Sequence, residues 1–498
     1  MNDSNRKRLI TIAVFVVIIG AAIFLAWRYL GAEAFIRTSL SGLTLGSLFF
    51  MVAAGLTLIF GLMDVLNFAH GAMFMLGAYM GWQFYTNPTF IFGLAPLIFA
   101  FATGLMLLPI IKPILIRLHL SERLQKTLPK LAYVLMFVLL ALGLWGFDIM
   151  NLADTAMVAI TTAMSSNPLA EISVQEATGP FVVRTVLLFL AGLVAAVGIA
   201  KPGDKTEFAT HDEIRKDLIT VGGLLIATLL LTIFRTALPE WILLMNGNLR
   251  FILAIVVAVV FGLIFGAVIE ITLIRPLYKR SMFIVLMTLG LSFVIREVVQ
   301  VLWTPLAYQM VRPPLFAQAG RAESLIEWLQ NGNATLNIFG VTFPTYRLFI
   351  ILLGLVMFLL VFILMTKTRL GMIIRAGVQD PEMVEAMGIN VRQVFTIVFA
   401  LGVGMAALGG IGAAPFIPIQ PLMGDTYQMQ GFITVVLGGM GSYVGAFIGA
   451  MTLGLARAFG DYFALKLSLS PAIAEASTVI IMIVVLLIRP SGLFGKKE

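Results

Sequence analysis

The chain has 498 residues, of which 60% are hydrophobic and only 12% are charged. Soluble domains carry about twice that share of charge, and apolar runs long enough to cross a bilayer recur along this chain, which excludes a soluble enzyme, a disordered protein and a fibrous protein. We attribute the net charge of +8 to membrane orientation and expect no nucleic acid partner. The expected fold class is an all-α polytopic integral membrane protein.

Apolar segments predict eleven membrane spans, followed by three further apolar segments near the C-terminus. The first span has no signal-peptide cleavage site, so we expect it to be retained. The spans are expected near residues 9–30, 40–61, 69–86, 89–111, 131–149, 181–200, 218–236, 250–274, 282–303, 346–366 and 394–416, and the further segments near 427–440, 443–461 and 471–488.

The distribution of basic residues predicts that both termini are cytoplasmic. If the spans alternate from an inside N-terminus, the inside segments hold 22 of the 33 Lys and Arg residues. The longest outside segment, 304–345, contains the amphipathic stretch Leu325–Leu329. We expect an external loop there with a short surface helix.

The first polar interruption of an apolar segment lies at Gly61–Gly71. Asn67 suits the N-cap of a helix from Phe68 onward. A break at membrane depth is costly unless the freed backbone groups face protein or a wet cavity, as they do in transporters. Either this is such a break, with Asp64, Asn67, His70 and Gly71 on the substrate path or its gate, or it is an ordinary cytoplasmic turn.

A second interruption combines Gly438, Gly439, Gly441 and Ser442. So many glycines disfavour a helix interior, and we predict that these four residues also line or gate the path. Gly441, Gly445 and Gly449 recur every four residues, which indicates close helix packing. Close packing alone would also explain these glycines.

The sequence of the inside loop 367–392 predicts a helix of about two turns at residues 381–387. Asp380 suits its N-cap, Pro381 its first position and Gly388 its C-terminal stop. So short a helix needs support from other structure. It either packs on the ends of the chain's own helices or the lipid interface, or docks in a groove of a soluble partner.

No enzyme chemistry is indicated. The chain has no cysteine and only three histidines, which lie far apart in the sequence, so we expect no metal site, no cofactor and no catalytic residue. Gly492–Lys497 lacks the spacing and the Ser or Thr of a phosphate-binding loop. We therefore expect no ATP site of that type in this chain.

Several ordered motifs resemble those of the branched-chain amino acid ABC importer permeases of the LivH type. The matching stretches are Asn67–Gly71, Ile269–Glu270 with Arg275–Leu277, Thr368–Gly371 with Asp380 and Gly388–Asn390, Val436–Ser442, and Pro490–Gly495. The resemblance covers roughly 38–86 and 250–495. It implies an importer-like helical bundle with broken or re-entrant helices.

The resemblance also implies the biological setting. Such a subunit moves branched-chain or related hydrophobic amino acids into the cytoplasm across a bacterial inner membrane. Its implied partners are a second homologous permease, two cytoplasmic ABC ATPases and a periplasmic or extracellular substrate-binding protein. The residues that would carry ATPase coupling are Arg375, Asp380, Pro381, Glu385, Ala386, Met387, Gly388 and Ile389.

Alternatives remain open at this point. Related permeases carry urea or short amides. A stand-alone ion-coupled transporter would need ionisable residues within the membrane, with Asp64 and Glu297 as the best candidates. A membrane scaffold that moves nothing is the third possibility. The expected organisation is an N-terminal part with an extra helix (1–37), a first core part (38–86), an inserted membrane region (87–249) and a second core part (250–498).

Overall fold

The computed structural model describes residues 27–63, 66–117, 121–153, 178–200, 211–278, 280–379, 381–470, 472–489, 492 and 494. Two units can be described within it. Unit 1 comprises Met1–Trp82, Phe251–Gln300 and Pro305–Glu498, and unit 2 comprises Gln83–Arg250 and Val301–Thr304. Most of the predicted span 9–30 lies outside the described residues.

Long apolar sequences form the helices that the composition predicts. Nine helices in the described part of the chain are long and apolar enough to cross a membrane, which confirms the all-α polytopic class. The helices wholly or partly in unit 1 are α2 (Ala32–Met63), α3 (His70–Thr86), α12 (Gly247–Ile269), α13 (Ser281–Trp303), α15 (Thr345–Lys367), α16 (Arg369–Gln379), α17 (Pro381–Ala386), α18 (Val391–Ala413), α19 (Met423–Gly438), α20 (Tyr443–Lys466) and α21 (Ala472–Ile488).

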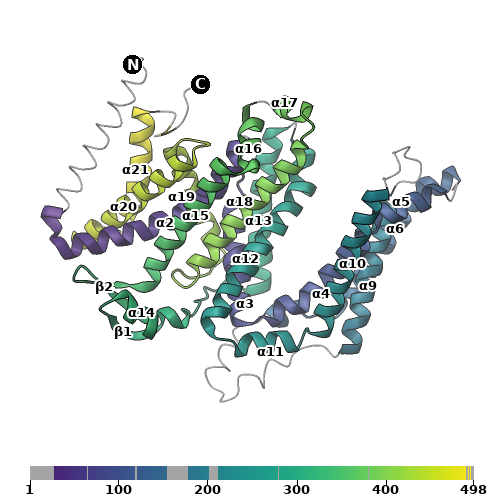
Figure 1. Cartoon of the computed structure of the whole chain (residues 1–498), viewed down its shortest axis with the longest axis horizontal. Coiled ribbons are helices and arrows are strands. Elements are labelled where there is room, and N and C mark those ends of the chain that lie inside the picture. Colours follow the sequence, from purple (N-terminus) through teal and green to yellow (C-terminus); the bar gives the residue numbers. More distant parts are fainter. Residues whose placement is uncertain are drawn as a thin grey trace. The chain divides into compact units, whose positions relative to one another are not determined.

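Helix α2 is the centre of unit 1. It packs against α15, α18, α19 and α20 (Figure 1). Small residues allow the helix backbones to approach closely, since a Cβ added at Gly454 of α20 would lie 2.2 Å from the backbone nitrogen of Gly46. Aromatic side chains fill the adjoining space, where Phe447 of α20 stacks on Phe358 of α15 with 4.3 Å between ring centroids.

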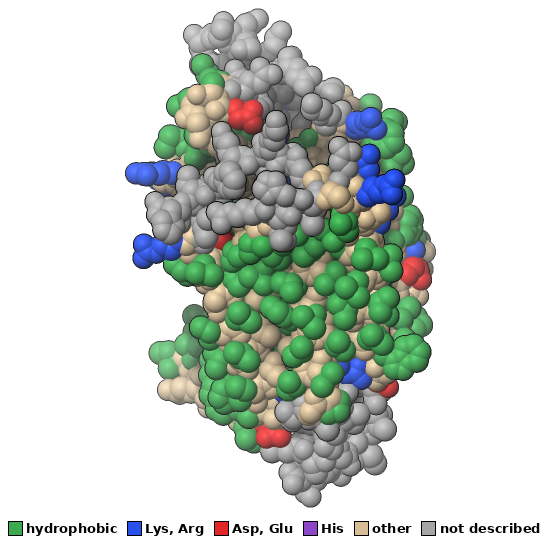
Figure 2. Space-filling model, turned by 90° about the vertical axis from the view of Figure 1, so that its right-hand side faces the viewer, with side chains coloured by type: hydrophobic (Ala, Val, Ile, Leu, Met, Phe, Trp, Pro, Cys, Tyr) green, Lys and Arg blue, Asp and Glu red, His purple; other side chains and the backbone are tan. Residues whose placement is uncertain are grey.

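Unit 2 is built from apolar helices with exposed hydrophobic faces. Its helices are α4 (Thr89–Leu105), α5 (Leu108–Arg117), α6 (Glu122–Leu144), α7 (Ile149–Ala153), α9 (Thr178–Ile199), α10 (His211–Ile233) and α11 (Ala237–Leu244). The chain bends by 72° between α10 and α11, at a position that the sequence analysis did not single out. Exposed side chains of unit 2 include Val134, Phe137 and Ile226, and Figure 2 shows hydrophobic side chains gathered over the viewed face. Such a surface suits lipid.

The segment 304–345 is more ordered than expected from its sequence. The short helix is present as α14 (Leu325–Asn331), but three strands surround it: β1 (Gln318–Ala322), β2 (Asn333–Ile338) and β3 (Val341–Pro344). β1 pairs with β2 in parallel and β2 with β3 antiparallel. Phe339 and Gly340 form the hairpin loop with positive φ angles of 51° and 85°, which two-residue hairpin turns require. The prediction of a plain loop with one helix missed this sheet.

Candidate translocation and coupling sites

The break between α2 and α3 lies in the interior of unit 1. Asn67 is only 1% exposed, and its side-chain oxygen accepts a hydrogen bond of 3.0 Å from the backbone N–H of Ala69. Asn67 therefore forms a local turn before α3, which begins at His70 and not at Phe68 as predicted. His70 is fully buried, and its Nε2 lies 3.2 Å from the carbonyl oxygen of Val52 in α2.

Gln428 of α19 completes this buried junction. Its side-chain Nε2 donates a hydrogen bond of 3.2 Å to the carbonyl of Asn67, and its Oε1 accepts one from the N–H of Gly71. A Cβ added at Gly71 would lie 2.1 Å from the carbonyl oxygen of Gly424, so only glycine fits there. The structure thus brings Asn67, His70 and Gly71 together in a packed junction. Asp64 lies outside the described residues.

The second interruption forms a tight turn between α19 and α20. Gly439 and Gly441 have φ angles of 99° and 79°, which glycine adopts without strain. The side chain of Ser442 then caps α20 by accepting a 3.1 Å hydrogen bond from the N–H of Gly445. The helices meet backbone to backbone, since a Cβ on Gly445 would lie 2.1 Å from the carbonyl oxygen of Gly438. Helix packing therefore accounts for Gly438 and Gly445.

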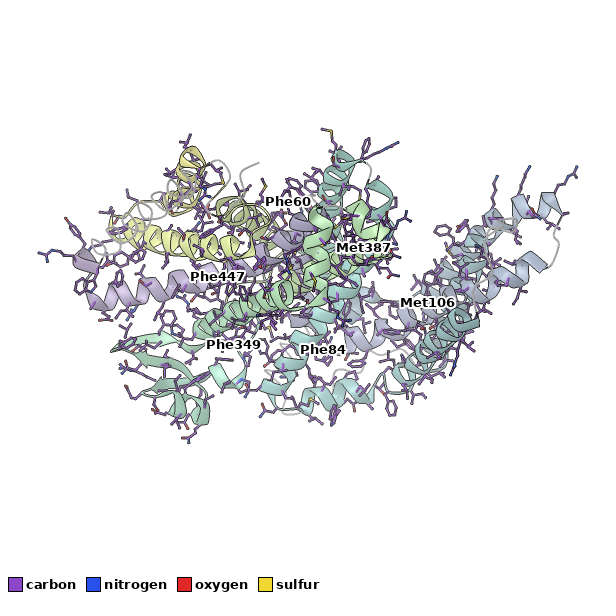
Figure 3. All side chains as sticks on the ribbon, turned by 45° about the horizontal axis from the view of Figure 1, so that its top comes forward. Phe60, Phe84, Met106, Phe349, Met387 and Phe447 are labelled. Atoms are coloured by element: carbon purple, nitrogen blue, oxygen red, sulfur yellow. The ribbon has the colours of Figure 1, made fainter. Side chains whose placement is uncertain are left out.

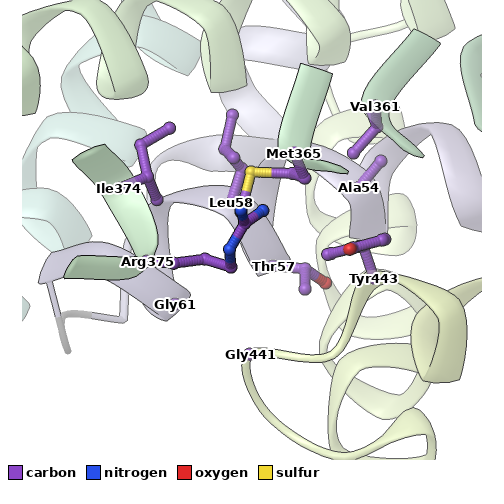
Figure 4. A pocket seen from close by; sticks show the side chains of 10 residues that line it. All are labelled: Ala54, Thr57, Leu58, Gly61, Val361, Met365, Ile374, Arg375, Gly441 and Tyr443. Carbon is purple, nitrogen blue, oxygen red and sulfur yellow. The ribbon is translucent and has the colours of Figure 1, made fainter. Parts of the chain in front are cut away.

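A cavity of about 210 Å³ opens beside this turn, and we call it the inner pocket (Figure 4). Its mouth carries Gly61, Arg375 and Gly441, with Tyr443 beside them. Its buried floor comes from three helices and consists of Ala54, Thr57, Leu58, Val361, Met365 and Ile374. The inner pocket thus joins Gly441 of the predicted path with Arg375 of the predicted coupling loop.

The coupling loop folds as two short helices, α16 and α17. α17 covers Pro381–Ala386, and Gly388 ends it with a φ of 81° and an N–H that donates 2.9 Å to the carbonyl of Glu385. The predicted helix and its glycine stop are therefore confirmed. Asp380 lies outside the described residues.

The side chains of α17 point in two directions. Val384 is buried, whereas Met387 directly after the helix is 75% exposed (Figure 3). Glu385 and Ala386 are also exposed, and Ile389 is half-buried against the core cluster that contains Ile374. The coupling loop therefore has one side that packs against the core of unit 1 and one side that is exposed.

Glu270 forms a buried polar cluster that links α12 to α18. Its carboxylate accepts hydrogen bonds of 2.8 Å from Arg275 and 2.7 Å from Thr396, and a further one from the Tyr278 hydroxyl. Burial, supported by the hydrogen bond to Glu270, raises the pKa of Tyr278 well above its usual range, so the phenol remains a donor. A short π-helical turn at Glu270–Ile274 precedes Arg275.

Sequence reasoning missed Gln428, Thr396 and the floor of the inner pocket. Gln428 lies in a mixed sequence with Asp425, Thr426 and Gln430, so only the fold identifies it as the buried hydrogen-bonding group. Glu270 and Arg275 were singled out only as part of a matching motif, although an ionisable residue next to a membrane span needs a partner. Thr396 and the pocket-floor residues have no feature in the sequence that indicates their role.

Comparison with known proteins places these features in a family. The family model described as "Branched-chain amino acid transport system / permease component" matches residues 216–488. The chain is 35% identical over 132 residues to the high-affinity branched-chain amino acid transport system permease protein LivH of Escherichia coli, which covers 26% of this chain and 41% of LivH. It is 32% identical over 152 residues to BraD of Pseudomonas aeruginosa, which covers 30% of this chain and 46% of BraD.

A third relative matches over a similar share of the chain. The probable LivH of Methanocaldococcus jannaschii is 30% identical over 167 residues, which covers 31% of this chain and 49% of the relative. In each of these alignments the chain spans less than half of the relative's length. No solved structure matches the chain. Since the family model covers more than half of its residues, the chain belongs to the family of branched-chain amino acid transport system permease components.

Proposed function

We propose that this chain is the membrane-spanning permease subunit of an ATP-driven importer of branched-chain or related hydrophobic amino acids. Family membership supports a transport role, and the names of LivH and BraD suggest the substrate class. The proposed partners are a second homologous permease, two cytoplasmic ABC ATPases and an external substrate-binding protein. ATP hydrolysis belongs to the partner chains, and this chain provides the path.

The two-sided α16–α17 segment is the observation that carries this proposal. Ile374 of α16 is buried in one core cluster with Leu58 of α2 and Val394 of α18. α17 follows in the same loop and exposes Met387 at its end. A partner that presses on the exposed side therefore pushes on helix ends that are already packed together.

The same segment reaches the inner pocket. Ile374 lies in the pocket floor and Arg375 at its mouth, and both belong to α16. A displacement of α17 would move this wall of the pocket relative to α2. We propose that ATPase closure gates the path in this way, with Gly438, Gly439, Gly441 and Ser442 forming the opposing turn. Asn67, His70 and Gly71 would hold the helices on which the gate moves.

We place the protein in a bacterial inner membrane with both termini in the cytoplasm. The basic-residue bias supports this orientation and puts the inner pocket at the cytoplasmic end of the path. We also propose that residues 87–249 are an insertion into the permease core. The separate contacts within unit 2, Gln83–Arg250 with Val301–Thr304, support that division.

An ion-coupled carrier has less support among the described residues. Glu297, one of its two candidate residues, exposes 65% of its side chain and lies 3.7 Å from Arg296. Such an exposed surface pair differs from the buried charged relay that ion coupling favours.

Reconstitution tests the proposal directly. The chain is incorporated into liposomes with its partner permease and ATPases, and uptake of L-leucine is measured with and without ATP and the binding protein. Uptake should require both, and urea should not be taken up. If the purified chain alone concentrates a solute against its gradient, the proposal is overturned.

A further inference from the structure

The inner pocket combines an aliphatic floor with one cation at its mouth. Leu58, Val361, Met365 and Ile374 are each less than 10% exposed, whereas Arg375 is exposed. Figure 4 shows the Arg375 side chain pointing from α16 into the space below Leu58. This arrangement matches a small molecule that is apolar at one end and anionic at the other.

Arg375 is available for such a ligand. Within the described part of the chain, its guanidinium forms no ion pair and no hydrogen bond, whereas Arg275 and Arg457 are both paired with carboxylates. A guanidinium presents a planar set of donors that binds a carboxylate through two hydrogen bonds.

Acceptors for a cationic group lie at the mouth and in the adjoining floor of the pocket. The carbonyl oxygen of Gly441 faces Gly61, where an added Cβ would lie 3.8 Å from it. The Thr57 hydroxyl donates 2.7 Å to the carbonyl of Ala53 and keeps its own lone pairs for a further donor. Tyr443 adds a third polar group. The mouth can therefore accommodate an ammonium group next to a carboxylate.

The volume suits an aliphatic amino acid. An apolar cavity of about 150 Å³ in another protein holds benzene, so about 210 Å³ has room for the isobutyl group of leucine while its charged groups remain at the mouth. We propose that the inner pocket is a binding subsite for the solute itself, in which Arg375 binds the carboxylate of an apolar α-amino acid at the cytoplasmic end of the path. This inference rests on the proposed function and gives Arg375 a role beyond ATPase coupling.

A thiol-protection experiment tests the subsite. The chain has no cysteine, so one engineered thiol reacts without background. Met365→Cys places it in the pocket floor, and Ala54→Cys on α2 is the second reporter, since neither residue supplies a polar group to the proposed ligand. The full chain in phosphatidylcholine nanodiscs, without ATPases, is labelled with a small methanethiosulfonate. L-Leucine should slow labelling several-fold, whereas L-leucinol, which lacks the carboxylate, should not.

Substitution of Arg375 tests directly whether its guanidinium binds the carboxylate. In the reporter background, Arg375→Gln should raise the leucine concentration for half-protection at least about tenfold, since it removes a hydrogen bond between charged groups. Arg369→Gln, on the same helix but outside the pocket, should leave protection unchanged. Equal protection by leucinol, or protection that survives Arg375→Gln, would overturn the carboxylate assignment.

Two further outcomes separate this inference from the proposed function. If phosphatidylglycerol protects the thiol and leucine does not, the pocket belongs to a lipid and the inference fails. If the assembled complex takes up leucine with ATP but leucine never protects either reporter, the inference fails and the proposed function stands. A complex that transports no branched-chain amino acid overturns the proposed function whatever the labelling shows.

Discussion

Gln428 donates a hydrogen bond of 3.2 Å from its side-chain amide to the backbone carbonyl of Asn67, although 361 residues separate the two in sequence. The same side chain accepts from the N–H of Gly71. One amide therefore satisfies backbone groups on both sides of the point where α3 begins. In a membrane interior, where water is scarce, these groups have few alternative partners.

Gln428→Leu is expected to destabilise the protein by about 2–4 kcal/mol, because it leaves two buried backbone groups without partners. The measurement is thermal or denaturant unfolding of the purified chain in detergent. Thr426→Ala on the same helix is the control, since Thr426 is exposed and its substitution should change stability by less than about 0.5 kcal/mol. Equal stability of the two variants would contradict the bridging role of Gln428.

Gly445→Ala should destabilise the α19–α20 hairpin. The new methyl group would lie 2.1 Å from the carbonyl oxygen of Gly438, so the helices must separate, at an expected cost of about 1–3 kcal/mol. Gly290→Ala on α13 is the matched control, because nothing lies within 4 Å of its added Cβ. The control should be stabilising by up to about 1 kcal/mol. Opposite shifts of the unfolding midpoint are the expected result.

Local sequence signals predicted most of the helices. Gly388 ends α17 as expected and Asn67 lies just before α3, because turns and helix ends depend on a few neighbouring residues, whereas the cap that Ser442 forms on α20 was not predicted. The long apolar runs predicted most of the spans, since a bilayer requires that length of helix. The predicted ends of the helices were less accurate. α6 begins at Glu122, whereas the span was expected to begin at residue 131.

Features that depend on distant parts of the chain were missed. The sheet needs β1 and β2 to pair across α14, and their short exposed sequences do not indicate such pairing. The contact between Arg375 and the inner pocket depends on how α16 lies against α2 and α15. Neither relationship is contained in a local pattern, so the candidate site was predicted only as separate segments.

Glu270→Gln should cost about 3–5 kcal/mol of stability, because it leaves Arg275 partly buried without its charged partner. Glu475→Gln is the control. It removes the charge from a carboxylate that is 66% exposed and 3.3 Å from Arg457, where a pair contributes at most about 1 kcal/mol. Unfolding in detergent measures both variants. Similar losses in the two would argue against the buried cluster as a structural link between α12 and α18.

Gly388→Pro tests the end of α17 under the proposed coupling mechanism. Proline requires a φ near −65° and has no N–H, whereas Gly388 has a φ of 81° and donates to Glu385. The substitution should distort the exposed loop and reduce co-purification with the ATPase subunits. Because Gly388 is exposed, the distortion should stay within this loop, and the membrane helices should still unfold in one cooperative transition. Normal ATPase association would contradict the docking role of this segment.

Met387→Glu tests the exposed side of the same segment without altering its backbone. A partner groove that accepts the methionine side chain would have to bury a carboxylate, so binding of the ATPases should weaken about tenfold or more. Met282→Glu is a matched control, since Met282 and Met387 are both 75% exposed. Affinity is measured by titrating the ATPases against the chain in nanodiscs. Equal weakening by both variants would mean that added negative charge alone, and not contact at Met387, explains the loss.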